Sequence, residues 1–273
     1  MAKIFFLFGL LSLTAGIHCQ STKKQTAIFT ECFDKERNFA VGWTAREFAN
    51  PANMAFVTAP GRAGNKALQI SLKKSDPESQ YGNKRTELTY NNFPKPEDID
   101  TSLTWWGFSN YFPEAYAADP AEEVIAQWHD KSPTCSASPP LAIQIKDDRF
   151  RASIIYSTAN YCQDRKSIVQ EYFDLGPVQK NSWNKWVIHY APRTDASGVV
   201  EVWINDSLAL QYHGPCQYIG SYFPYFKIGL YKWQWMPDWK GEQSTQTERT
   251  YFLDDIKIAS DASALRPPAA NKK

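Results

Sequence analysis

One segment of this 273-residue chain carries charged, phenolic and aromatic side chains at alternate positions. In residues 225–233, Tyr225, Lys227, Tyr231 and Trp233 alternate with apolar residues. Side chains alternate between the two faces of a β-strand, so these four share one face. An ordinary solvent-exposed face could carry the same residues, so this segment alone does not identify a site.

A second segment, residues 124–129, has a polar face of the same kind. Gln127 and His129 fall on one side of the expected strand, whereas Val124 and Trp128 fall on the apolar side. A single histidine is more often a surface or core residue than a catalytic one. His129 stands out because a second hydrogen-bonding side chain shares its face.

The third segment is Lys84–Leu88, in which Arg85 and Glu87 share a face. The two could form a surface ion pair of little energetic value. Alternatively, Glu87 could hold the Arg85 guanidinium in the orientation that binds a carboxylate through two hydrogen bonds.

The combined side chains suit β-elimination from a uronic acid. Arg85 and Gln127 could neutralise the uronate carboxylate and stabilise the charge that develops when the C5 proton is removed. His129 and Tyr231 could supply the base and the acid, in either order. Lys227 could lower the pKa of the Tyr231 phenol or hold the negative charge of the substrate.

Aromatic and polar residues provide further candidates for sugar binding. The chain has 10 Trp, 14 Tyr and 16 Phe, which mainly indicate a large β core but can include flat platforms for sugar rings. The residues expected to bind substrate are Lys84, Glu87, Gln144, Lys146, Tyr225, Lys227 and Trp233.

The elements that must position these residues are strands. Short alternating or apolar segments recur between Gly, Pro, Asn and Asp, and no long stretch has helical amphipathic spacing. This pattern predicts an all-β protein with two packed sheets, one of them curved around a concave groove. The expected strands are 67–72, 84–90, 103–112, 123–129, 141–146, 150–156, 184–191, 199–204, 225–233 and 250–258.

A hairpin is expected from 141–146 and 150–156, with its turn at 147–150. Pairing the strands so that opposed residue numbers sum to 297 places Ile143 opposite Ile154 and keeps apolar residues together.

The same register places Cys135 opposite Cys162. Opposed residues of an antiparallel pair lie within disulfide range, so we predict a Cys135–Cys162 bond. Cys32 and Cys216 could pair with each other or remain free.

The first 19 residues have the features of a signal peptide: Lys3, an apolar run over 4–13, and small residues at 14–16. We therefore expect a secreted or periplasmic protein without a membrane span. Residues 20–262 are expected to form a single domain, followed by a disordered tail over 263–273.

The charge balance limits the possible partners. The chain has 30 Lys and Arg against 29 Asp and Glu, and Lys3 leaves with the signal peptide, so the mature net charge is zero. This excludes a broadly basic nucleic-acid binder and disfavours a heavily sulfated glycan. We expect a monomer that binds an acidic polysaccharide.

Three motifs resemble those of jelly-roll alginate lyases, in the same order: Arg85–Leu88, Gln127–His129 and Tyr225–Tyr231. The wider layout over residues 28–260 is also similar to glucuronan and heparin lyases. The resemblance implies a concanavalin-like β-jelly-roll and a polysaccharide lyase that leaves a 4,5-unsaturated uronate at the new non-reducing end.

The resemblance also implies residue roles. Arg85, Gln127, His129 and Tyr231 match catalytic positions, and Lys227 matches a groove residue. Trp128 and Lys232–Trp233 depart from the alginate lyase motifs, and together with the neutral net charge they favour another unsulfated polyuronate, such as glucuronan.

The chemistry requires no cofactor, but related jelly-rolls often hold a structural Ca²⁺. The resemblance implies Asp254 and Glu31 as its ligands, because Asp254 falls on the face of its strand that Ile256 and Ile258 share. Hydrogen bonds from backbone amides to the Asp254 carboxylate are the alternative.

Two other functions remain open. A sandwich glycoside hydrolase needs two carboxylates at the scissile bond, and the usual Glu-x-Asp-x-x-Glu run is absent from the sequence. A non-catalytic carbohydrate-binding module would share the fold and the aromatic residues, but it would not need His129 and Tyr231 in one groove.

Overall fold

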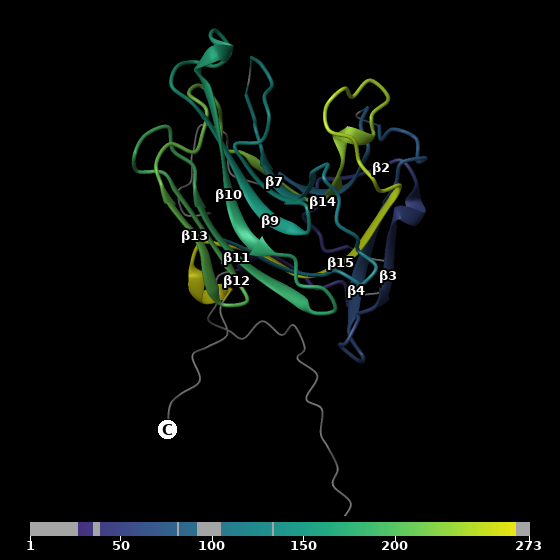
Figure 1. The fold of residues 1–273 in the computed structure, drawn as a ribbon. Helices are drawn as coiled ribbons and strands as arrows, with labels where there is room; N and C mark the ends of the chain where they lie inside the picture. Colours follow the sequence, from purple (N-terminus) through teal and green to yellow (C-terminus); the bar gives the residue numbers. More distant parts are fainter. Residues whose placement is uncertain (1–26, 35–38, 81, 92–104, 133, 266–273) are drawn as a thin grey trace, which may run out of the picture.

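The computed structural model describes residues 27–34, 39–80, 82–91, 105–132 and 134–265. Their strands form two antiparallel sheets stacked face to face (Figure 1). This arrangement confirms the all-β, two-sheet sandwich predicted from the strand periodicity. The predicted signal peptide lies outside the described residues.

One sheet has eight strands in the order β13-β12-β11-β6-β15-β4-β3, with β1 paired to β15. Its strands are β1 (Ala27–Glu31), β3 (Met54–Thr58), β4 (Lys66–Lys73), β6 (Trp105–Tyr111), β11 (Trp183–Ala191), β12 (Val199–Ile204), β13 (Ser207–His213) and β15 (Glu248–Ala259).

The other sheet has seven strands in the order β10-β9-β8-β7-β14-β5-β2. Its strands are β2 (Ala45–Phe48), β5 (Arg85–Tyr90), β7 (Glu123–His129), β8 (Leu141–Lys146), β9 (Arg149–Ser157), β10 (Ile168–Pro177) and β14 (Tyr225–Tyr231). Four short 3-10 helices complete the described structure: η1 (Pro51–Asn53), η2 (Arg165–Ser167), η3 (Trp233–Trp235) and η4 (Ala262–Ala264).

Aromatic side chains fill the space between the sheets. Trp106 of β6 and Trp128 of β7 meet edge to face at 5.3 Å between ring centroids, and both are fully buried. Phe226, Ile228 and Leu230 of β14 lie in the same core. The apolar face of β14 therefore packs inward, as its alternation predicts, and the polar face is turned outward.

The β8–β9 hairpin has a different register from the predicted one. Its turn is only Asp147–Asp148, both with positive φ (50° and 62°), as a two-residue hairpin loop requires. Ile143 therefore pairs with Ala152 rather than with Ile154. The prediction was wrong by two residues, a shift that leaves every side chain on its expected face.

Irregularities on two strands change which residues face the core. The register of β7 shifts between Val124 and Ala126, so Ile125 lies in the core and Val124 faces outward, contrary to the prediction. The register of β15 shifts between Asp254 and Lys257, and Asp255 has a φ of 55°. Such β-bulges insert an extra residue and reverse the alternation.

The described part of the chain is packed as far as its last residue, Leu265, which lies three positions beyond the predicted domain boundary. Ala264 and Leu265 are buried against Val187 and Ala259. The rest of the predicted tail lies outside the described residues. No helix in the described ranges is long and apolar enough to span a membrane.

Candidate active site

A cleft of about 570 Å³ lies on the outer face of the seven-stranded sheet. Side chains from β5, β14, β7, β8, β9 and β10 contribute to it. It is lined by Asn83, Arg85, Glu122, Val124, Gln127, His129, Ser136, Ala137, Ser138, Pro139, Ala142, Gln144, Ser153, Ile155, Gln170, Tyr172, Tyr231 and Trp233.

The cleft brings together all four residues proposed as catalytic. β14 lies between β5 and β7 in the sheet, and β7 and β14 can be found in Figure 1. The registers place Tyr231 opposite Arg85, and Lys227 opposite Gln127. His129 is opposite Tyr225 and stacks on its ring at 5.0 Å between centroids.

Beneath the cleft, four charged side chains form a buried cluster of zero net charge. Lys227 Nζ lies 2.7 Å from Glu47 and 3.1 Å from Glu87. Arg85 Nη1 lies 3.1 Å from Glu47 and 3.2 Å from Glu87. Burying a charge is costly unless it is paired, and here each charged group has two partners of opposite sign.

Within this cluster, Glu87 and Arg85 keep their charges at neutral pH. Burial disfavours the ionised form of Glu87, but Lys227 and Arg85 outweigh this effect and hold the pKa of Glu87 below its ordinary value. Burial also disfavours the Arg85 cation, yet Glu87, Tyr231 and Glu47 together raise its pKa. The Arg85 guanidinium carbon lies 4.3 Å from the centre of the Tyr231 ring.

Glu47 was not among the residues predicted from the sequence. It lies on β2, opposite Glu87 in the register, and its Oε1 accepts a hydrogen bond from Thr89 at 2.9 Å. β2 has only four residues and gives almost no periodic signal. The ion pair with Lys227 links residues 180 positions apart, so no local pattern could have shown it.

Gln127 is fully buried beside this cluster, and the negative charge of Glu87 fixes which way its side-chain amide points. Glu87 is ionised and can only accept hydrogen bonds, so the Gln127 side chain points its Nε2 group at Glu87. Gln127 Oε1 and Arg85 Nε have no hydrogen-bond partner among the described residues. Unpaired buried polar atoms are rare, and these two mark where a bound ligand or solvent would complete the hydrogen bonding.

The His129 side chain is arranged as a base. Its Nδ1 lies 3.0 Å from the backbone carbonyl oxygen of Asp130, which can only accept, so Nδ1 carries the proton. Burial, followed by the positive charges of Lys227 and Arg85, lowers the pKa of His129 below its usual value. The ring is therefore neutral at pH 7, and the other nitrogen, Nε2, can accept a proton.

The Tyr231 side chain is arranged as an acid. Burial, and then the Glu87 carboxylate, raise the pKa of the phenol, although Arg85 opposes the change. Of the two roles expected as alternatives for Lys227, lowering this pKa is not observed, because the pKa is raised and Lys227 is bound to Glu47 and Glu87 and only 2% exposed. Tyr231 remains protonated and can donate a proton.

The other predicted binding residues occupy different positions. Gln144 and Trp233 line the cleft, whereas Glu87 and Lys227 lie beneath its floor and Tyr225 contacts His129. Lys84 is buried, and its ammonium binds the Asp76 carbonyl oxygen instead of lining the cleft. Lys146 pairs with Glu242 at 2.5 Å and does not line the cleft either.

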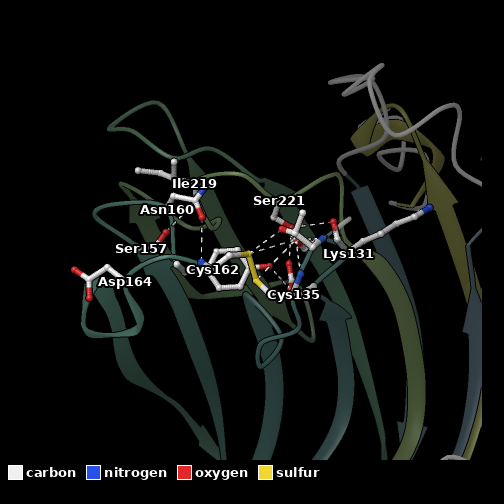
Figure 2. The surroundings of a disulfide bond; sticks show 12 residues. Lys131, Cys135, Ser157, Asn160, Cys162, Asp164, Ile219 and Ser221 are labelled. Atoms are coloured by element: carbon white, nitrogen blue, oxygen red, sulfur yellow. Dashed lines mark hydrogen bonds between the residues drawn. A yellow bond between two sulfur atoms is a disulfide. The ribbon is translucent and has the colours of Figure 1, made fainter.

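A disulfide lies next to the 136–139 segment, which forms one wall of the cleft, and Figure 2 shows the surroundings of this bond. The predicted Cys135–Cys162 bond is confirmed, with 5.7 Å between the Cα atoms. Both cysteines lie beyond the ends of the β8–β9 ladder, so the bond joins two loops rather than two paired strands. It holds the start of the 136–139 segment, whose residues line the cleft. Cys216 is a buried free thiol and does not pair with Cys32.

A second buried ionic cluster lies next to the segment that carries Trp233. Lys232 Nζ lies 2.9 Å from Asp119 and 3.5 Å from Glu123, and Arg249 pairs with Glu123 at 2.6 Å. Lys232 immediately precedes η3, so this cluster fixes the start of the segment that presents Trp233 to the cleft.

The two residues implied as calcium ligands are bound to other parts of the protein. Glu31 accepts hydrogen bonds from the Phe33 amide at 3.1 Å and from Trp43 Nε1 at 3.2 Å. Asp254 lies 2.8 Å from Arg62 and accepts a hydrogen bond from the Asp255 amide at 2.8 Å. No group of three or more His, Cys, Asp or Glu side chains that could hold a metal ion occurs in the described part of the chain.

Comparisons with known proteins agree with this geometry. A family model described as polysaccharide lyase matches residues 33–257. The endo-β-1,4-glucuronan lyase of the fungus Trichoderma reesei superposes with a TM-score of 0.72 at 19% identity, covering 90% of this chain and 100% of that chain. A marine alginate lyase from Aplysia kurodai gives a TM-score of 0.56 at 10% identity, covering 86% and 100%. No curated protein matches the sequence.

The binding domain of botulinum neurotoxin serotype D is also similar, with a TM-score of 0.50 at 12% identity, covering 86% of this chain and 48% of that chain. At these identities the likeness concerns the fold, and the lyase neighbours confirm the predicted β-jelly-roll. Because one fold can carry unrelated functions, the activity must be argued from the cleft residues.

Proposed function

We propose, from the premise that this chain belongs to the polysaccharide lyase family, that it cleaves an unsulfated, uronate-containing polysaccharide by β-elimination in this cleft. One observation carries the mechanism: a neutral histidine and a protonated tyrosine line the same cleft as a fixed arginine. The product is a 4,5-unsaturated uronate at the new non-reducing end.

The residue roles follow from the protonation states. Arg85 faces the uronate carboxylate and stabilises the charge that spreads onto it as C5 loses its proton. His129 Nε2 takes that proton, and the electrons of the C5–H bond form the C4–C5 double bond. The C4–O4 bond breaks, and Tyr231 donates its proton to the departing oxygen. A later proton transfer through solvent restores both residues.

The charges around the cleft support an unsulfated substrate. Arg85 and Lys227 are both neutralised by Glu47 and Glu87, and most of the other lining residues are uncharged. A heavily sulfated chain would favour a strongly basic surface. The likeness to a glucuronan lyase favours a glucuronan-type polymer within this class.

Export from the cytoplasm is part of the proposal. A structural disulfide forms and persists mainly in oxidising compartments, and Cys135–Cys162 is such a bond. The amino-terminal sequence has the composition of a signal peptide.

The test is an ultraviolet absorbance assay for the unsaturated product. The purified protein and its Tyr231→Phe variant are incubated with glucuronan, alginate and sulfated glycosaminoglycans. We expect an absorbance rise on an unsulfated polyuronate and its loss in the variant. New reducing ends without absorbance would indicate hydrolysis. Binding without either product would indicate a carbohydrate-binding module, and each of these outcomes would overturn the mechanism.

A further inference from the structure

Away from Tyr231, Arg151 of β9 contacts three residues that line the cleft, although it is not itself among the lining residues. Arg151 Nε donates to Gln144 Oε1 at 2.9 Å, and its guanidinium forms an ion pair with Glu122. The guanidinium carbon lies 4.2 Å from the centre of the Tyr172 ring. An arginine is thus held in a fixed orientation over an aromatic ring at the cleft.

The strand registers align this group with the proposed catalytic residues. Arg151 is opposite Gln144, which is opposite Val124. Val124 is opposite Tyr231, which is opposite Arg85. One row across the sheet therefore has an arginine at each end. β5 and β9 are four strand spacings apart, about 19 Å at 4.7–4.9 Å each. Only an oligosaccharide of several units can span that length.

A second row leads to Tyr172 in the same way. Tyr172 is opposite Ser153, Ser153 is opposite Ala142, and Ala142 is opposite Gln127. Figure 1 shows β10 and β9 on one side of the sheet, with β7 and β14 beyond them. A polymer that binds Arg85 and Gln127 and crosses the strands of this sheet passes over Ser153 and reaches Tyr172.

The properties of Tyr172 suit a sugar platform. Its side chain is 49% exposed, which is unusual for a large ring, and the residue lines the cleft. Arg151 lies against the ring and restricts its movement. Gln170, also in the cleft lining, donates a hydrogen bond to Ser153 at 2.9 Å. Sugar hydroxyls can therefore meet polar groups on either side of a flat apolar surface.

We propose that Arg151 and Tyr172 form a second uronate-binding subsite, several sugar units from the scissile bond. Tyr172 stacks on one pyranose face, and Arg151 binds the carboxylate of that unit in competition with Glu122. This inference rests on the proposed function and adds to it, because the substrate must then carry uronates at two separated positions. A polymer that is bound at both ends of the cleft extends beyond the scissile bond, which favours cleavage within a chain.

The test compares kcat/KM on a polyuronate with kcat/KM on its trisaccharide, which is too short to reach both arginines. Tyr172→Ala and Arg151→Met are measured beside Leu208→Ala, a control with 51% exposure on β13 of the other sheet. We expect Tyr172→Ala and Arg151→Met each to lower the polymer-to-trisaccharide ratio ~2- to 10-fold, the range of a lost aromatic or charged contact. The control should keep the wild-type ratio.

Two further variants separate the charge from the shape of this subsite. Glu122→Gln removes the internal competitor for Arg151, so we expect a lower KM for the polymer. Arg151→Lys keeps the charge but loses the planar donor pair, so we expect an intermediate ratio. Arg151→Met should also weaken the dependence of KM on ionic strength. Thermal unfolding of each variant shows whether it is folded.

The outcomes are distinguishable. An active wild-type enzyme whose polymer-to-trisaccharide ratio is the same in folded Tyr172→Ala and Arg151→Met would overturn the subsite and leave the proposed function standing. Equal losses on both substrates would also overturn it, since they would place these residues at the scissile bond. A wild-type enzyme with no unsaturated product from any polyuronate would overturn the proposed function and the subsite together.

Discussion

Replacing Glu47 with Gln tests whether the buried charges beneath the cleft are balanced as described. Arg85 and Lys227 carry two positive charges, and Glu47 and Glu87 carry two negative charges. Glu47→Gln keeps the shape of the side chain but leaves the cluster with a net charge of +1. Its amide can still accept from Thr89, so the main change is the lost neutralisation of two buried cations.

The burial of these four side chains sets how much the free energy of unfolding should fall in the Glu47→Gln variant. The side chains of Lys227, Glu87, Glu47 and Arg85 are all less than 10% exposed. Breaking a buried ion pair from one side costs ~3–5 kcal/mol, because the remaining charge is left uncompensated. Glu87 still provides partial compensation, so we expect a loss near ~3 kcal/mol. For a domain of this size that corresponds to a Tm lowered by roughly 6–12 °C.

The assay is thermal unfolding followed by circular dichroism at pH 7, with Glu242→Gln as the matched control. Glu242 pairs with Lys146 at the surface, where its side chain is 52% exposed, and such pairs contribute about 0–1 kcal/mol. Combining Glu47→Gln with Lys227→Met restores a neutral Arg85–Glu87 pair and should recover part of the loss. A Tm within 2 °C of wild type for Glu47→Gln would refute the charge-balance argument.

Two further predictions concern pH and the disulfide. The base form of His129 is lost as pH falls through its lowered pKa, so kcat/KM should decline only below about pH 6.5, the ordinary histidine value. Lys227→Met removes a nearby positive charge and should move this decline to higher pH. A profile that does not move in this variant would argue against His129 as the base. The phenol pKa of Tyr231 is raised, so the alkaline decline should lie above about pH 10. Replacing both Cys135 and Cys162 by Ser opens a loop of 27 residues and should cost ~3–4 kcal/mol in urea unfolding. The wall over 136–139 should also loosen and raise KM, and an unchanged KM would mean that the wall does not contact substrate.

Strand periodicity was sufficient to place Arg85, Gln127, His129 and Tyr231 on the faces that line the cleft. The polar faces of the segments around Arg85, Gln127 and Tyr231 all turn outward as alternation predicts. The prediction worked because successive side chains of a regular strand must point to opposite faces. A two-residue error in the β8–β9 register changed no face for the same reason.

Irregular positions were not predictable in this way. The shift after Val124 and the positive φ of Asp255 reverse the alternation, so Val124 faces the cleft and Asp254 faces Arg62. A bulge inserts one residue without a distinctive local composition. The partners of the Asp254 carboxylate are the Arg62 side chain and the backbone amide of Asp255.

The sequence by itself determined the all-β class, the outward faces of three strands and the four residues that meet in the cleft, because these depend on local alternation. Only the tertiary structure decided the electrostatics of the site. Glu47 reaches the cluster through β2, and its pairing with Lys227 depends on the order of β2, β5 and β14 across the sheet. The protonation states of His129 and Tyr231 depend on burial and on charges from neighbouring strands, which a single strand's sequence cannot contain.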